Sequence, residues 1–329
     1  MATEDVKAVW LDCDPGRHDD AFAILLAAHS PSIKLLGIST VAGNQSIDKT
    51  TFNAWKMAAV ANLPSSIPVI QGQGKPLLRE GRHDPDIHGE SGLEGSSDLG
   101  DYYTSARRKR RSVLHSIDSP LVQLTRYFYT HAALTNVALL LTLYPNIHSK
   151  IEQAIAVMGG AIGIGNRSPV AEFNILLDPE AARVVFSSSI KTIMVPLEVT
   201  HTALATEAVL KRIKDFNTPF GDMSVDLLTF FKDTYERVFG FKHPPVHDPC
   251  AMAYVIAPGI FRTRSFLHVE VVVGDHKCAG QTVCDVWKDF SKDPPNVHVA
   301  EKMDVDKFWD LMIDALKCCD KATPFNAFV

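Results

Sequence analysis

The sequence predicts an α/β fold, namely one domain with a mainly parallel open sheet and helices on both faces. Short apolar runs rich in β-branched residues alternate with helical stretches along most of the 329 residues. Several of these runs end in Asp, Asn or Gly just before the next helix, which is typical of parallel sheets that bind ligands at their carboxyl edge. The length allows two domains, but no linker divides the chain, so we expect one domain over residues 1–329.

The N-terminal strand and helix show this pattern most clearly. Apart from Lys7, residues 6–11 are apolar; Pro15 and Gly16 are expected to form a turn, and residues 21–28 are rich in Ala and Leu. Similar apolar runs predict further strands at residues 33–41, 67–71, 121–129, 155–160, 192–196, 266–274 and 296–299. The strands late in the chain could include an antiparallel strand at the edge of the sheet.

Helix signals follow most of these strands. Asp178 is an expected N-cap with Pro179 at the first helical position, and Asp248 begins another helix with the same pattern. The apolar repeat of an amphipathic helix extends over residues 225–239 and 306–319. Further helices are expected to end near Ala61, at Leu143 and at Phe216.

Composition limits the expected partners and location. A net charge of −5 argues against nucleic acid or an anionic membrane surface as the main partner. No N-terminal signal segment and no apolar run of membrane-spanning length is visible, so we expect a cytoplasmic protein. The six cysteines lack zinc-like pairs and favour reduced thiols.

Two polar segments allow more than one interpretation. A Gly-rich loop around His88 could approach a ligand or close as a lid, or be an ordinary surface loop. Residues 107–111 are all basic; such a run can be a nuclear signal or a nucleic-acid patch, and is more commonly an exposed, solvated segment.

Four carboxylates crowd the first strand-to-helix turn: Asp12, Asp14, Asp19 and Asp20. At the end of a buried strand they would repel one another and lose solvation, so we expect a cation among them. Oxygen ligands favour Ca²⁺ or Mg²⁺ over zinc, whereas Cys13 faces the other side of the strand and is expected to pack. Helix capping by Asp19 and Asp20 is the alternative, and it leaves the other two acids unexplained.

Six motifs, in order along nearly the whole chain, resemble the nucleoside hydrolase family in its inosine-uridine-preferring branch. They comprise residues 9–16 with 19–21, 43–45, 87–92, 158–160, 171–174 with 178–181, and 246–249. The resemblance implies a single-domain α/β homodimer or homotetramer that uses one Ca²⁺. The implied activity is hydrolysis of the N-glycosidic bond of uridine- or inosine-type ribonucleosides to ribose and free base, in nucleoside salvage. The tryptophans are isolated, which favours this branch over a purine-specific one that sandwiches the base between neighbouring tryptophans.

The resemblance also implies the metal and catalytic residues. Asp14, Asp20 and Asp248 would give carboxylates to Ca²⁺, with a backbone carbonyl from the turn at Thr130 and His131. Because breaking the bond builds oxocarbenium character on the ribose, negative charge near the sugar is favourable. Ca²⁺ would orient the ribose diol and lower the pKa of a water molecule, and Asp14 would take the proton of that water.

The same resemblance implies the substrate contacts and the acid. Ribose contacts are expected from Asp19, Asn44, Asn166, Glu172 and Asn174, and base contacts from His88 and Phe173. His247 is the candidate acid for the leaving base, because imidazole titrates near working pH. The alternatives are a capping or buried histidine at His247 and a simple turn residue at Asn44.

Two departures from the family pattern lie close to the expected metal. Arg17 and His18 both precede Asp19 where the family has one residue, and one extra residue can shift a loop by up to about 3.5 Å. At residues 130–136 the family has Thr-Gly-small-Leu-Thr-Asn, so either His131 replaces the threonine or a residue is inserted after Thr130.

The segment around residues 94–130 also has no recognisable counterpart in the family. Together these departures motivate a second hypothesis, a catalytically impaired family member that binds nucleoside or acts structurally. A Mg²⁺-dependent phosphatase with Asp12 and Asp14 in its nucleophile motif fits poorly, because Pro15 and Gly16 follow the motif.

Overall fold

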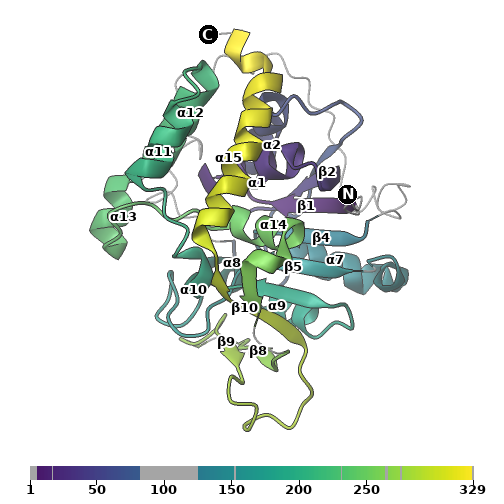
Figure 1. The fold of residues 1–329 in the computed structure, drawn as a ribbon. Coiled ribbons are helices and arrows are strands. Elements are labelled where there is room, and N and C mark those ends of the chain that lie inside the picture. Colours follow the sequence, from purple (N-terminus) through teal and green to yellow (C-terminus); the bar gives the residue numbers. More distant parts are fainter. Residues whose placement is uncertain are drawn as a thin grey trace.

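An eight-stranded sheet runs through the computed structural model, which describes residues 6–16, 18–81, 125–151, 153–230, 232–263, 266–274 and 276–327 (Figure 1). Its strand order is β3-β2-β1-β4-β5-β6-β10-β7. All neighbours are parallel except β10 and β7, which are antiparallel. The predicted parallel sheet with a late antiparallel edge is therefore confirmed. The strands are β1 (Lys7–Cys13), β2 (Ile33–Thr40), β3 (Val69–Gln71), β4 (Tyr127–Thr130), β5 (Ala154–Met158), β6 (Thr192–Val195), β7 (Phe261–Thr263), β8 (Val269–Val271), β9 (Thr282–Cys284) and β10 (Val297–Met303).

Helices connect the strands and cover the sheet (Figure 1). The α-helices are α1 (His18–His29), α2 (Ile47–Val60), α7 (Thr135–Leu143), α8 (Phe173–Leu177), α9 (Pro179–Phe186), α10 (Leu197–Thr200), α11 (Glu207–Lys214), α12 (Pro219–Thr229), α13 (Lys232–Phe239), α14 (Asp248–Ile256) and α15 (Val305–Ala322). The 3₁₀ helices are η1 (Pro145–Ser149), η2 (Pro258–Ile260) and η3 (Pro324–Ala327). None of the helices in the described part of the chain combines the length and the apolar character that a membrane span needs.

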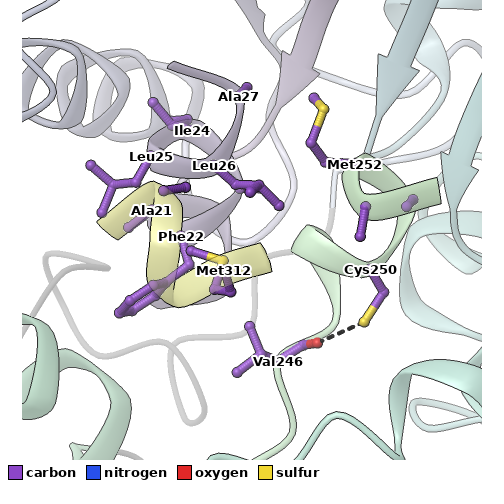
Figure 2. Close-up of a cluster of buried hydrophobic side chains, with 14 of the residues drawn as sticks. Ala21, Phe22, Ile24, Leu25, Leu26, Ala27, Val246, Cys250, Met252 and Met312 are labelled. Atoms are coloured by element: carbon purple, nitrogen blue, oxygen red, sulfur yellow. Dashed lines mark hydrogen bonds between the residues drawn. The ribbon is translucent and has the colours of Figure 1, made fainter. Parts of the chain in front are cut away.

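The two faces of the sheet bury separate apolar clusters, because side chains alternate across each strand. Val9 and Cys13 of β1 join a large cluster with α1, α2, α14 and α15, whereas Trp10 joins a second cluster with α7 and α9. Figure 2 shows side chains of α1 gathered with Met312 of α15 and Cys250 of α14. The expected core packing of Cys13 is confirmed, and none of the six cysteines is joined in a disulfide.

The cap at the start of α9 forms as the sequence predicts. Asp178 Oδ1 accepts a hydrogen bond of 3.0 Å from the Ala181 N–H, and Pro179 occupies the first helical position. Asp178 Oδ2 accepts from the Thr135 hydroxyl at 2.6 Å and from the Leu77 N–H at 2.8 Å. This buried carboxylate therefore holds together three segments that are distant in sequence.

The single helix expected over residues 225–239 is wrong, because the structure has two helices there. The first, α12, begins earlier, at Pro219, where the Thr218 hydroxyl accepts a hydrogen bond of 3.1 Å from the Gly221 N–H. It ends at Thr229, whose hydroxyl donates to the Val225 carbonyl at 2.9 Å. Such bonds from a threonine to the preceding turn weaken and bend a helix.

The strand expected over residues 266–274 is shorter in the structure. Only Val269–Val271 form a strand, β8, which pairs with β9 in a separate two-stranded sheet. Gly274 has φ +100°, a conformation that ends the extended run. For the strand expected at residues 121–129, the described part begins at Thr125 and forms β4.

Candidate active site

Most of the predicted site residues meet where the parallel strands end. Asp14 follows β1, Asn44 follows β2 and His131 follows β4, so the order of these strands places the three side chains together. A small pocket opens at this edge. Its lining residues are Asp19, Asn44, His131, Met158, Asn166, Glu172, Phe173, Asn174, His247 and Asp248. His88, Arg17 and residues 107–111 lie outside the described residues.

A buried group of potential metal ligands lies beside this pocket. Asp20, His131 and Asp248 each offer one donor atom, and these atoms lie within 4.8 Å of one another. The backbone N–H groups of Asp14 and Gly16 donate to the Asp20 carboxylate at 3.3 Å and 3.4 Å. Three of the four residues expected at the metal therefore gather at one point.

Asp14 lies next to this group and is linked to it by Asn44. The Asn44 side-chain amide donates to Asp14 Oδ1 at 3.3 Å and to Asp20 Oδ2 at 3.1 Å, and the Asn44 N–H donates to Asp14 Oδ2 at 2.8 Å. Burial raises the pKa of Asp14 well above its ordinary value, and the charge of Asp20 raises it further. A cation beside these carboxylates would relieve both effects.

Asp12, the remaining acid of the first turn, has structural partners instead. Its Oδ1 accepts from the Ser39 hydroxyl and, at 2.8 Å, from the Asn136 amide. Burial raises the pKa of Asp12 to about 6, while these hydrogen bonds oppose the shift. Asp12 therefore joins β1 to β2 and α7.

The two sequence departures leave these residues at the site. Although Arg17 adds a residue to the turn, α1 begins at His18, Asp19 lines the pocket and Asp20 joins the ligand group. At the second departure, β4 pairs with β1 through Thr130 without a bulge, and the His131 N–H continues the ladder by donating to the Asp12 carbonyl at 3.2 Å. This continuity favours replacement of the family threonine by His131 over an insertion.

Gly43 makes room for the Asp14 carboxylate. A Cβ atom at Gly43 would lie 2.0 Å from Asp14 Oδ2 and 3.1 Å from the Leu177 side chain, so any larger residue must displace the carboxylate.

We expect Gly43→Ala to lower the catalytic rate of this site at least about tenfold, because it displaces the Asp14 carboxylate by more than catalytic geometry tolerates. Steady-state kinetics measures the change, and circular dichroism checks the fold. Gly259→Ala is the matched control, since a Cβ there meets nothing within 4 Å. Equal activity of the two variants would contradict this role for Gly43.

Glu172 organises a second part of the pocket lining. Its carboxylate caps α8, accepting from the N–H groups of Asn174 at 2.9 Å and Ile175 at 3.2 Å, and it also accepts from the Gly160 N–H at 3.0 Å. The Asn174 amide donates to the Met158 carbonyl at 3.2 Å. This buried acid is held in place at the carboxyl end of β5.

Asn166 is tied to the same part of the lining. Its Oδ1 accepts from the Phe173 N–H at 2.9 Å, which fixes the loop before α8 against the helix start. Asn166 and Phe173, which are predicted to contact the sugar and the base, are therefore joined by a hydrogen bond, and both line the pocket.

His247 reaches the pocket from the residue before α14. Its Nδ1 lies 2.8 Å from the Thr200 hydroxyl, and its Nε2 lies 3.5 Å from the Tyr235 hydroxyl. The His201 ring packs edge-on against it with centroids 5.4 Å apart. Sequence reasoning missed Thr200, Tyr235 and His201. Thr200 follows β6 closely, a position that could have suggested it, whereas α13 carries no comparable signal for Tyr235.

The residues at this edge suit a divalent cation. The donors are buried, two of the three are carboxylates, and no Lys or Arg is among the described residues that line the pocket. Removing such acids from water without a counter-charge is unfavourable. Asp20, Asp248 and His131 would hold the ion, with Asp14 beside it.

Comparisons with known proteins agree with this geometry. The family model described as inosine-uridine preferring nucleoside hydrolase matches residues 9–310. A probable ribonucleoside hydrolase of Dictyostelium discoideum is 42% identical over 97% of each chain. An inosine-uridine preferring nucleoside hydrolase of Leishmania major is 40% identical over 94% of this chain and 98% of its own. The structure of a purine-preferring ribonucleoside hydrolase from Gardnerella vaginalis superposes with a TM-score of 0.83 and 28% identity, over 95% of this chain and 99% of that chain.

Fold, site and comparisons together define an N-glycosyl hydrolase. The chain belongs to the inosine-uridine preferring nucleoside hydrolase family, which confirms the resemblance carried by its motifs. The roles of individual residues stay predictions.

Proposed function

We propose that this protein hydrolyses the N-glycosidic bond of ribonucleosides to ribose and free base, with uridine- and inosine-type nucleosides as substrates and Ca²⁺ as the expected metal. One observation carries the proposal: the potential ligands Asp20, His131 and Asp248 lie together, and Asn44 links Asp14 to Asp20. The pocket beside them is also lined by Glu172 and Asn174.

The chain's own groups suit the chemistry of this bond. As the bond breaks, positive charge develops on the ribose ring, and the buried carboxylates of Asp19 and Glu172 are placed to stabilise it. Asn44, Asn166 and Asn174 offer amide groups that hold and orient hydroxyls. When bound, the metal ion would orient the ribose diol and lower the pKa of a water molecule.

Two proton transfers complete the proposed reaction. Asp14, whose pKa burial raises, accepts the proton of the attacking water. His247 donates a proton to the leaving base, and the hydroxyl of Thr200 at 2.8 Å from Nδ1 fixes the orientation of the ring.

Liquid chromatography of uridine and inosine incubated with the purified protein tests the activity, with free base and ribose as products. Hydrolysis that depends on enzyme concentration supports the proposal. Nucleoside binding by calorimetry without any hydrolysis would instead support the catalytically impaired alternative.

We expect His247→Ala to slow inosine hydrolysis by about 10²-fold, because inosine releases a base that needs a proton. An activated substrate such as 4-nitrophenyl riboside, whose leaving group needs none, should slow much less. The ratio of kcat values for the two substrates measures this effect. His148→Ala, at a half-buried histidine that does not line the pocket, is the control, and an equal loss on both substrates would exclude the acid role.

Four finer properties belong to this proposal: the base preference, the assembly, the location and the role in nucleoside salvage. The names of the relatives include both inosine-uridine preferring and purine-preferring enzymes, so the base preference rests on the isolated tryptophans. A homodimer or homotetramer and a cytoplasmic location, with roles in nucleoside salvage, are expected from the family resemblance. Light scattering on the purified protein tests the assembly.

A further inference from the structure

The one nitrogen donor in the ligand group comes from His131. Its position is fixed by the backbone, since the His131 N–H continues the β1–β4 ladder to the Asp12 carbonyl. Its side chain is 0% exposed and packs on the Tyr129 ring with centroids 5.0 Å apart. The imidazole therefore points into the buried group rather than to solvent.

The His131 ring faces Asp20 without forming a hydrogen bond. Nε2 lies 3.1 Å from Asp20 Oδ1, yet neither ring nitrogen has a hydrogen-bond partner among the described residues. The 3.1 Å separation suits a nitrogen and a carboxylate oxygen that bind one shared cation. Two ligand atoms that are each about 2.1 Å from an ion, at roughly a right angle to each other, lie about 3.0 Å apart.

Nitrogen changes which ions such a group prefers. Ca²⁺ and Mg²⁺ take oxygen ligands almost exclusively, whereas imidazole suits first-row ions such as Zn²⁺ and Co²⁺. A backbone carbonyl at this turn, which the sequence resemblance implies, would have kept the ligand set all-oxygen. The side chain of His131 gives the set two carboxylates and one imidazole.

We propose that His131 is a side-chain metal ligand and that this site binds first-row divalent cations such as Co²⁺ and Zn²⁺ more tightly than Ca²⁺. The inference rests on the metal site of the proposed function but not on the reaction. It makes His131 the residue that determines metal selectivity in this chain.

A second, exposed group must be removed before the test. His268, Glu270 and Asp293 also lie close enough to share an ion, at the surface. His268→Ala removes a ligand of that surface group and leaves the buried group unchanged. Every measurement therefore uses the His268→Ala protein as its background. Comparing this protein with wild type shows how much metal the surface group binds.

Calorimetric titration of the metal-free His268→Ala protein with Co²⁺ and with Ca²⁺ is the first test. We expect Co²⁺ to bind at least tenfold more tightly than Ca²⁺. His131→Thr should weaken Co²⁺ binding by roughly 10–100-fold or more, since the loss of even an outer-shell partner of a metal ligand lowers metal affinity by that much. The same substitution should change Ca²⁺ affinity far less. Equal affinities for the two ions, or unchanged Co²⁺ binding in His131→Thr, would overturn the inference.

X-ray absorption at the cobalt edge reports the atoms that bind Co²⁺. This measurement does not depend on whether a His131 variant folds. The Co²⁺-loaded His268→Ala protein should show the outer-shell scattering of one imidazole. An all-oxygen environment would refute the ligand role. Loss of ribonucleoside hydrolysis with imidazole ligation intact would instead count against the proposed function alone, so the two failures are distinguishable.

Discussion

Asp14→Asn is expected to lower kcat for ribonucleoside hydrolysis by about 10³-fold or more while the protein stays folded. Asparagine keeps the shape of the side chain and can still accept the hydrogen bond of 2.8 Å from the Asn44 N–H, but it cannot take a proton from water. Steady-state kinetics with uridine measures the loss, and thermal unfolding followed by circular dichroism confirms the fold.

Asp12→Asn is the matched control for this prediction. Asp12 is equally buried on the same strand end, but its Oδ1 accepts from Ser39 and Asn136 rather than facing the pocket. Its substitution should change kcat by less than about tenfold, because asparagine retains an acceptor for these donors. Near-normal turnover in Asp14→Asn would eliminate it as the general base, and equal losses in both variants would point to a general electrostatic effect.

Removing divalent cations is expected to abolish hydrolysis and to lower the melting temperature by several degrees. Asp14, Asp19, Asp20 and Asp248 are all at most 5% exposed, and burial together with the charge of Asp20 raises the pKa of Asp14. A cation at 100 times its Kd would stabilise the folded state by about 2.7 kcal/mol, provided that it binds only the folded state. Differential scanning calorimetry before and after chelation measures the loss of this stabilisation.

Adding Ca²⁺ back should restore both activity and melting temperature, and elemental analysis should verify that the chelated protein is free of metal. Asp20→Asn is the accompanying variant: it removes one carboxylate of the ligand group, so its melting temperature should respond less to Ca²⁺. Full activity of protein shown to be metal-free would contradict the proposed role of the cation.

Local signals predicted most strands and helices correctly. The Asp-Pro signal found the start of α9, because a side-chain cap acts within one turn and depends on no distant residue. Periodicity failed over residues 225–239, where α12 and α13 each show an apolar face but the Thr229 hydroxyl bonds to the preceding turn. Periodicity reports which residues are apolar, and it does not register where one helix stops and the next begins.

The candidate site was predictable where its residues follow strands, and less so elsewhere. Asn44 and Asp14 could be paired from sequence because both follow strands of one parallel sheet. Tyr235 could not be predicted, because its contact with His247 depends on where α13 lies in space, which no local pattern of residues encodes. The sequence placed His131 at the metal through its backbone, whereas the structure turns its side chain into the ligand group.

The sequence by itself determined the parallel α/β class, the family and the edge of the sheet that carries the site, since alternation, strand-end polar residues and ordered motifs are all local properties. Only the tertiary structure decided what each acid of the first turn does. Because β1 lies between β2 and β4, Asp12 accepts hydrogen bonds from Ser39 and Asn136, while Asp14 accepts them from Asn44. That division depends on the order of strands in space, which no local pattern of residues encodes.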